Sequence, residues 1–389
     1  MMYEKEVKEK VTAILPQVVT WRRHFHEYPE LSGKEVKTSA YIQDVFKNLG
    51  IPYETGFFQN AVLGIIKGSH PGKTVALRAD MDALPVTELT GLPFASKNEG
   101  VMHACGHDGH MSILLGAAAV LNEMKDQIHG TVKIVFQPAE EEAAIRNIAA
   151  SGKLDDVSEI YGLHVWPELP TGQVGLKPGA LMAASDRFYV HIKGKSTHAA
   201  QPHNGTDALV AAAHFIIDVQ SLISREMNPM DNVVCTIGLM NAGTRYNVGV
   251  EDAYLEGTCR TYRPELRDKM EARLGEILKG LDVMFHTHSE LNYVRGHSAT
   301  INTPEKIDFL KKVGKAYLGE EHITEPEFPS MCAEDFSSYL EKFPGAFFWL
   351  GTGDGNTPAL HNASFAINES ILPLGITLEA AAALEALSR

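Results

Sequence analysis

Apolar residues near the start of the chain recur at the spacing of a helix. The pattern runs from Val7 to Val18 at intervals of three and four residues, which places these side chains on one helical face. Pro16 falls inside this stretch and is expected to kink or divide the helix. A second helix is predicted over Lys34–Leu49, because a glycine and then a proline follow it closely.

Short runs rich in β-branched residues then alternate with helical stretches. Strands are predicted at Val62–Lys67, Thr74–Leu77, Val132–Phe136 and Ile160–Leu163, and helices at His107–Met124 and Ala143–Ala150. This alternation predicts an α/β fold whose sheet is covered by helices on both faces.

The segment between Asp186 and Tyr293 has a different order of elements. It predicts strand Phe188–Lys193, helix Asp207–Arg225, strands Val233–Leu239 and Ala253–Tyr262, helix Pro264–Leu281 and strand Met284–Tyr293. The order β-α-β-β-α-β is that of a ferredoxin-like α+β domain. Motifs that carry chemistry lie on both sides of it, so we expect a domain over 185–295 inserted into a catalytic domain built from 1–184 and 296–389.

The chain after the inserted domain returns to the first pattern. Thr303 and Pro304 suit the cap and first turn of a helix that ends near Gly319. A strand near Phe347–Leu350 and a final helix rich in Ala and Leu follow.

Composition and charge narrow the class of protein. With 389 residues the chain exceeds the roughly 100–200 residues of one domain. The net charge of −14 argues against a nucleic-acid partner, because phosphate contacts need clustered Lys and Arg. The apolar run Ile113–Leu121 is shorter than the roughly 20 residues that span a bilayer, so no membrane segment or membrane partner is expected.

The cysteines indicate a reducing compartment. Only four are present, and Cys105, Cys235, Cys259 and Cys332 are too scattered for a disulfide scaffold. A cytoplasmic location is therefore expected.

Several segments bring metal-ligand side chains to the ends of predicted strands. These are Arg78–Asp82, Gln137–Glu141, Gly162–His164 and Leu360–Asn362, while His103–His110 offers further ligands where a helix begins. Because the carboxyl ends of strands in an open sheet line one crevice, we expect these groups to converge.

Thiolate, imidazole and carboxylate together indicate divalent metal ions. Such mixed donors hold zinc and also admit manganese, cobalt or nickel. Of the adjacent Glu140 and Glu141, one can bind metal while the other moves a proton. Asp80 and Asp82 are expected to orient the ligand histidines.

Other residues of the same types have structural explanations. Cys235 and Cys259 lie in predicted strands and are expected in the core. His103 and His110 are as apt to cap or pack near the helix as to bind metal, and His286–His288 alternates along a predicted strand. Cys105 differs, because it lies between two histidines at a helix start, where a thiolate is favoured.

The same segments resemble the dimetal amidohydrolases that include hippurate hydrolase, auxin-conjugate hydrolases and N-acetyldiaminopimelate deacetylase. The resemblance covers nearly the whole chain in order, in the segments His24–Ser32, Arg78–Pro85, His103–His110, Gln137–Glu141, Gly162–His164, Ser196–His203, Tyr246-Asn247, Gly257–Arg260, Ala333–Phe336 and Leu360–Asn362.

Carried over residue by residue, the resemblance implies a site with two divalent metal ions. It implies the metal ligands Cys105, His107, Glu141, His164 and His361, with Glu140 as general base and acid and Asp82 in support. It implies that the inserted domain is a lid that mediates homodimerisation. His198 would reach the substrate carbonyl, often from the partner subunit, and Asn247 and Arg260 would hold the substrate carboxylate.

One segment departs from the family pattern. Members of the family usually have glycines after the paired glutamates, whereas this chain has Glu142-Ala143-Ala144-Ile145-Arg146. The shape of one pocket wall is therefore not predicted by the resemblance.

The sequence thus predicts hydrolysis of N-acyl amino acids, with acetyl or aromatic acyl groups. A metallocarboxypeptidase or dipeptidase that acts on small peptides is the nearest alternative, since a carboxylate grip suits either substrate. A non-catalytic binding protein for amino-acid conjugates and a hydrolase with Cys105 as nucleophile are the other hypotheses.

Overall fold

The computed structural model describes residues 3–142 and 148–388 and divides the chain into two compact units. The first unit has residues 1–181, 301–328 and 335–389, and the second has residues 182–300 and 329–334. The chain thus passes into the second unit for residues 182–300, goes back to the first unit, and visits the second again for the short segment 329–334. Most of the helix expected over Ala143–Ala150 lies outside the described residues.

The first unit is built on a mixed sheet of eight strands in the order β1-β2-β4-β3-β5-β14-β6-β13. The strands are β1 (Tyr53–Glu54), β2 (Val62–Lys67), β3 (His70–Asp80), β4 (His129–Gln137), β5 (Val157–Pro170), β6 (Val174–Gly175), β13 (Ile323–Thr324) and β14 (Gly345–Gly353). The neighbours β4, β3, β5 and β14 are parallel to one another. Their carboxyl ends therefore share one edge of the sheet.

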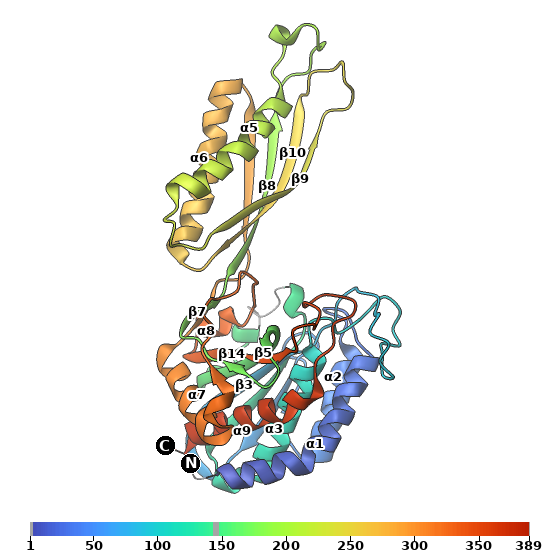
Figure 1. Ribbon diagram of the computed structural model, residues 1–389, viewed down its shortest axis with the longest axis vertical. Helices are drawn as coiled ribbons and strands as arrows, with labels where there is room; N and C mark the ends of the chain where they lie inside the picture. The colour runs from blue at the N-terminus through green and yellow to red at the C-terminus, as the bar shows by residue number, and fades with distance from the viewer. Residues whose placement is uncertain (1–2, 143–147, 389) are drawn as a thin grey trace. The chain divides into compact units, whose positions relative to one another are not determined.

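Helices cover the sheet, and the long ones form the core with it. They are α1 (Glu4–Glu27), α2 (Val36–Leu49), α3 (His107–Glu123), α7 (Pro304–Tyr317), α8 (Ser337–Leu340) and α9 (Leu372–Leu387). Helices α3 and α9 pack on each other and on β3, and α1 lies along both (Figure 1). Along β3, Leu77 and Ala79 join this core, whereas the alternate residues Arg78 and Asp80 serve the site described below.

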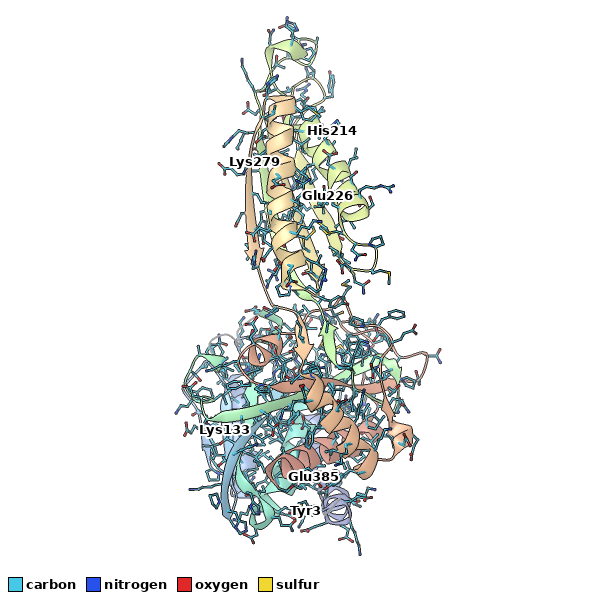
Figure 2. All side chains as sticks on the ribbon, turned by 90° about the vertical axis from the view of Figure 1, so that its left-hand side faces the viewer. Tyr3, Lys133, His214, Glu226, Lys279 and Glu385 are labelled. Atoms are coloured by element: carbon cyan, nitrogen blue, oxygen red, sulfur yellow. The ribbon has the colours of Figure 1, made fainter. Side chains whose placement is uncertain are left out.

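The second unit has the ferredoxin-like order expected from the sequence. It contains β8 (Ala184–Lys193), α5 (Ala208–Ser221), β9 (Val234–Ala242), β10 (Asp252–Thr261), α6 (Pro264–Phe285) and β11 (His288–Arg295). The four strands are antiparallel in the order β11-β8-β10-β9. Figure 2 shows His214 and Lys279 on the two helices, which cover one face of this sheet and bury a core of their own. The strands β7 (Gly179–Met182) and β12 (Thr300–Asn302) pair where the chain passes between the units.

The structure differs from the sequence-based expectation at two places. Pro16 does not divide the first helix, because α1 is continuous from Glu4 to Glu27. Pro16 and Thr12, whose carbonyl loses its donor, are both exposed, so the Thr12 carbonyl is accessible to solvent. Met284 does not begin a strand, because α6 continues to Phe285 and ends at His286 in the left-handed conformation, with φ of 55°. Only His288 of the His286–His288 stretch belongs to β11.

Two helices are long and apolar enough to cross a membrane by length and composition alone. In Glu369–Leu387, 78% of the apolar window is buried, as in the core helix of a folded domain; in Ala208–Glu226 the share is 33%. The second of these contains α5, whose buried face packs on the strands β8, β9 and β10.

Candidate metal centre

The five expected metal ligands lie together at the carboxyl edge of the parallel strands. Among the groups of side chains in the described residues whose ligand atoms lie within 4.8 Å of one another, three contain at least two of these ligands: Cys105, His107 and His164; Cys105, Glu141 and His361; and His107, Glu140 and Glu141. The groups share Cys105, His107 and Glu141, so they form one continuous cluster of thiol, imidazole and carboxylate donors. All of these residues belong to the first unit.

The expected ligands come from four segments of the first unit. Cys105 precedes α3, His107 opens it, and Glu140 and Glu141 follow β4 in a short turn. His164 lies inside β5, not at its end as expected, because that strand continues to Pro170. His361 lies in a loop after β14, which ends at Gly353, so the expectation that His361 ends a strand is wrong.

Two histidines each direct one ring nitrogen at the cluster. His107 donates from Nδ1 to the Asp82 carbonyl oxygen at 2.8 Å, and His164 donates from Nδ1 to the Val165 carbonyl oxygen at 2.7 Å. These bonds fix the tautomer and leave Nε2 as a lone-pair donor. Nε2 of His107 is buried and has no hydrogen-bond partner among the described residues. Nε2 of His164 lies 3.4 Å from the Cys105 sulfur.

His110 has a different environment from His107, although both belong to the first turn of α3. Its Nδ1 lies 2.7 Å from Asp80 Oδ1, and its Nε2 accepts the Val165 N–H at 2.9 Å. Both ring nitrogens are therefore used within the protein. Asp80 also accepts a bond from Arg78 at 2.8 Å, so the pair belongs to a buried network under the cluster.

Burial of the Cys105 thiol favours a bound cation. Burial raises the pKa of this thiol, although the neighbouring His107 opposes the shift. A thiolate at this position therefore needs a positive charge at the sulfur, and a divalent metal ion supplies it. The buried Nε2 of His107 also lacks a partner among the described residues, and a bound metal ion would accept its lone pair. The donor set thus fits divalent metal ions of the zinc, manganese, cobalt or nickel type.

Backbone geometry holds the cluster in place. Gly106 has φ of 91°, and a Cβ there would lie 2.4 Å from a methyl carbon of Val165, so only glycine fits between Cys105 and His107. His361 has φ of 66°, and its N–H donates to the Ala104 carbonyl oxygen at 2.8 Å. This bond ties the His361 loop to the Cys105 segment.

Helix α1 anchors the start of α3. Asp108, next to His107, accepts bonds from Arg22 Nε and His26 Nδ1, each at 2.8 Å. Burial alone lowers the pKa of His26, but the Asp108 carboxylate raises it to about 9. His26 is therefore a cation at neutral pH, and Oδ2 of the buried Asp108 accepts from two cations.

Asp82 joins the histidine ligand to the paired glutamates. Its carboxylate accepts the N–H groups of Glu140 at 3.0 Å and Glu141 at 3.2 Å, and the Ser32 hydroxyl at 2.6 Å. The Glu140 carboxylate itself accepts the Asp335 N–H at 3.4 Å. Asp335 in turn is bonded by Arg78 at 2.6 Å and by Gln137 at 2.6 Å.

The remaining expected site residues, His198, Asn247 and Arg260, lie in the second unit. The loops that carry His198 and Asn247 are paired, because the Ala199 N–H donates to the Asn247 carbonyl oxygen at 3.1 Å. Arg260 lies near the other end of β10 from these loops. Eight residues of strand separate Arg260 from Asp252, which corresponds to roughly 25 Å.

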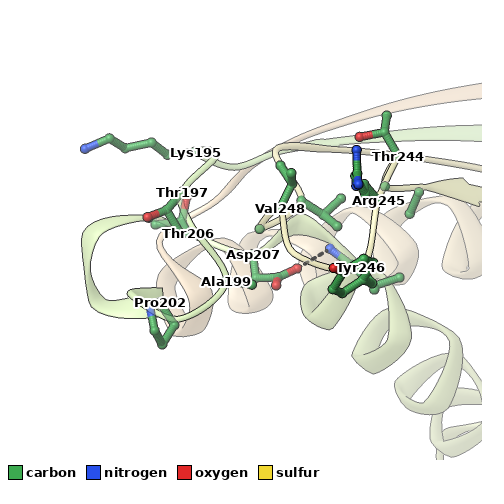
Figure 3. A pocket seen from close by; sticks show the side chains of 16 residues that line it. Lys195, Thr197, Ala199, Pro202, Thr206, Asp207, Thr244, Arg245, Tyr246 and Val248 are labelled. Carbon is green, nitrogen blue, oxygen red and sulfur yellow. Dashed lines mark hydrogen bonds between the residues drawn. The ribbon is translucent and has the colours of Figure 1, made fainter.

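A pocket of about 490 Å³ opens beside the His198 and Asn247 loops. Its lining includes the neighbours of both residues, Thr197, Ala199, Tyr246 and Val248, which Figure 3 shows around Asp207 at the start of α5. Oδ1 of Asn247 is buried and has no hydrogen-bond partner among the described residues.

The sequence assigned no role to several residues that shape the cluster, although Ser32 and Asp335 lie in segments that carry the family resemblance. The hydrogen bonds of Ser32, Glu35 and Asp335 to it cross 50 or more positions of the chain. Glu35 stands in a charged stretch before α2 that has the composition of an ordinary helix start. No local pattern distinguishes it.

Comparison with known proteins adds a family and several relatives. The model of peptidase family M20/M25/M40 matches residues 76–385. An N-acetyl-L-cysteine deacetylase of Bacillus subtilis (strain 168) is 39% identical over 92% of this chain and 85% of its own. Thermostable carboxypeptidase 1 of Saccharolobus solfataricus is 35% identical over 98% of each chain. The structure of the Bacillus subtilis YXEP protein, a dinuclear metal-binding peptidase of the M20 family, has 35% identity and a TM-score of 0.86 over 97% of this chain and 99% of that one.

Proposed function

The chain belongs to peptidase family M20/M25/M40, and from this membership and the ligand cluster we propose that it is a metal-dependent amidohydrolase that cleaves N-acyl amino acids. The products are a carboxylate and a free amino acid. The observation that carries the proposal is the position of Glu140, a glutamate whose carboxylate lies among the donor atoms of His107 and Glu141. The likeness to an N-acetyl-L-cysteine deacetylase supports the substrate class.

We assign Cys105, His107, Glu141, His164 and His361 to two divalent metal ions. Two overlapping groups with Cys105 in common suit two neighbouring ions, and the dinuclear M20 structure supports this number. Bound ions of this kind lower the pKa of a coordinated water toward about 7 and polarise the amide carbonyl. The residues of the chain then have to move protons and hold the substrate.

Glu140 is the proton carrier in this proposal. Its carboxylate takes a proton from the attacking water and delivers it to the nitrogen of the leaving amino acid. The main-chain N–H of Asp335 holds the carboxylate, and the Asp82 carboxylate holds the Glu140 backbone. This arrangement leaves Glu141, the next residue, to bind metal.

His198, Asn247 and Arg260 are the proposed lid residues. His198 stabilises the oxyanion that develops on the substrate carbonyl, and Asn247 and Arg260 hold the substrate carboxylate. Because roughly 25 Å of β10 separates Arg260 from the Asn247 end of the lid, one lid cannot bring both to a small substrate. We therefore propose a homodimer in which the lid of one subunit supplies His198 and Asn247 to the site of its partner.

A carboxypeptidase activity on small peptides is the second candidate. It is favoured by the likeness to thermostable carboxypeptidase 1, which covers 98% of this chain. The two activities differ only in what is attached to the amide carbonyl. A cytoplasmic location accompanies either proposal, because all four cysteines are free.

Amine release tests the proposal. The metal-free protein is supplied with Mn, Zn, Co or Ni and assayed on N-acetyl and N-benzoyl amino acids and on dipeptides. Metal-dependent release that disappears in Glu140→Gln, but persists in the matched neighbour variant Glu142→Gln, supports the amidohydrolase. Activity that ignores chelators but stops on thiol alkylation would instead identify Cys105 as a nucleophile. Absence of turnover with every metal would favour a binding protein.

A further inference from the structure

The residue before the proposed general base has an unfavourable backbone conformation. Ala139 has φ of 56° and is 2% exposed, and its backbone lies in the left-handed region that is unfavourable for a residue with a Cβ. It lies between Gln137, the last residue of β4, and Glu140. The direction in which Glu140 leaves the strand therefore depends on contacts that hold Ala139.

Three successive N–H groups of this turn are bound by two buried carboxylates. Glu35 Oε1 accepts the Ala139 N–H at 2.8 Å, while Asp82 accepts the next two, from Glu140 and Glu141. Successive N–H groups around a left-handed residue form a concavity that binds anions. In this protein two of its own carboxylates fill the concavity.

The Glu35 side chain bonds to this turn and does not cap helix α2, which follows it in the chain. It precedes α2 and makes no side-chain cap bond there. Glu30 caps α2 instead, because its Oε2 accepts both the N–H and the hydroxyl of Thr38. Glu35 is fully buried, and its remaining bonds come from the Gly33 N–H at 2.9 Å and from Asn60 Nδ2 at 3.1 Å.

We propose that Glu35 is a positioning residue for Glu140. It acts by fixing the Ala139 backbone, so that the Glu140 carboxylate is presented to the reacting groups in one orientation. The inference rests on the proposed function, in which Glu140 is the proton carrier. Displacement of a catalytic group by about 1 Å can cost roughly 10²-fold in rate.

Steady-state kinetics of the metal-loaded enzyme test the proposal. Glu35→Ala removes the acceptor, and we expect kcat to fall by about 10- to 100-fold while KM and the metal content of the protein stay near wild type. Glu35→Gln keeps Oε1 for the Ala139 N–H, and the Asn60 amide can rotate to accept from Nε2. This variant is therefore expected to retain most of kcat.

Two matched controls separate positioning from stability. Asn60→Ala removes a bond to the other oxygen of Glu35, and Glu30→Gln weakens the cap of α2; both should keep kcat. If Glu35→Ala does not fold, Glu35→Asp, which is one methylene too short to reach Ala139, replaces it. A lower melting temperature with unchanged kcat in the Glu35 variant would overturn the proposal, and so would a loss of bound metal that accounts for the loss of activity.

Hydrogen exchange gives a readout that needs no turnover. Peptides that cover residues 138–142 should exchange faster in Glu35→Ala than in wild type, and in Asn60→Ala they should not. If the wild-type protein hydrolyses no substrate, the proposed function fails, and the exchange result alone decides whether Glu35 holds the turn. Unchanged exchange in Glu35→Ala would then overturn the inference.

Discussion

The main-chain carbonyl of Asp82 accepts a hydrogen bond from Nδ1 of His107 at 2.8 Å. The carboxylate of the same residue accepts the N–H groups of Glu140 and Glu141. Asp82 thus orients a proposed metal ligand through its backbone and the proposed proton carrier through its side chain. Substitution of the side chain affects one of these tasks and spares the other.

Asp82→Ala should therefore lower kcat more than it lowers metal binding. Loss of the two N–H acceptors frees the Glu140 turn, and we expect kcat to fall by about 10²-fold. The carbonyl that orients His107 remains, so metal content measured by mass spectrometry should stay near wild type. Ser32→Ala removes a single bond to the same carboxylate and serves as the control. Loss of metal in Asp82→Ala would mean that the carboxylate, 3.5 Å from Nδ1, also orients His107.

Metal should protect Cys105 from alkylation. The sulfur lone pairs of a metal-bound thiolate are engaged, so iodoacetamide should modify Cys105 slowly in the loaded protein and faster after chelation. Cys332 is exposed and provides an internal control that reacts equally in both forms. Peptide mass spectrometry measures the two sites separately. Equal modification of Cys105 with and without metal would remove it from the ligand set.

Two inactive variants should complement each other if the lid acts on its partner. His198→Ala and Glu140→Ala are each expected to be nearly inactive as homodimers. In a mixed dimer the intact lid of one subunit meets the intact metal centre of the other. Random pairing should then restore about a quarter of wild-type activity, since half of the dimers are mixed and each has one complete site. No recovery in dimers shown to be mixed would place His198 in the site of its own subunit.

Glu379 should make the protein less stable as the pH rises. This residue of α9 is 1% exposed, and its Oε2 has no hydrogen-bond partner among the described residues. Burial raises its pKa well above the usual value. At a pH below the pKa that Glu379 has in the unfolded protein, this residue is protonated in both the folded and the unfolded state, and its burial carries no charge penalty. As the pH rises above that value the unfolded state ionises first, and stability falls by at most about 1.4 kcal/mol per pH unit.

Thermal unfolding of Glu379→Gln tests this effect. The variant should melt above wild type at pH 8, and the difference should shrink as the pH approaches about 4.5. Comparison at each pH cancels the titration of all other groups. The exposed Glu99→Gln variant is the matched control and should follow wild type. A difference that stays constant with pH would show that Glu379 is ionised in the folded protein.

Elements with a strong repeating pattern were predictable from sequence. Strand β2 has the predicted limits Val62–Lys67, and the order of elements in the second unit follows from the spacing of apolar residues. Strands of two to four residues, such as β6 and β13, were not predicted, because pairing with distant strands creates them. For the same reason the assignment of residues 329–334 to the second unit has no local signal.

The sequence predicted which residue types form the site, but it did not predict the role of every single residue. The ligand types of His103–His110 are visible in the sequence, but their spacing alone does not distinguish His107 from His110, and only the family resemblance selects His107. The distinction depends on their partners, since His110 uses both ring nitrogens while His107 leaves Nε2 free. Glu35 could not be found for a similar reason, because its role exists only after β4 delivers Ala139 beside it.

The position of β14 in the sheet has a consequence for synthesis on the ribosome. All strands and helices of the ferredoxin-like unit have left the ribosome before β14 is made, whereas β14 lies between β5 and β6. Until residues 345–353 emerge, β5 is the edge of an unfinished sheet with unpaired backbone groups. We expect truncated chains that stop between Asn302 and Gly345 to aggregate through this edge, and nascent chains at that stage to need protection by chaperones.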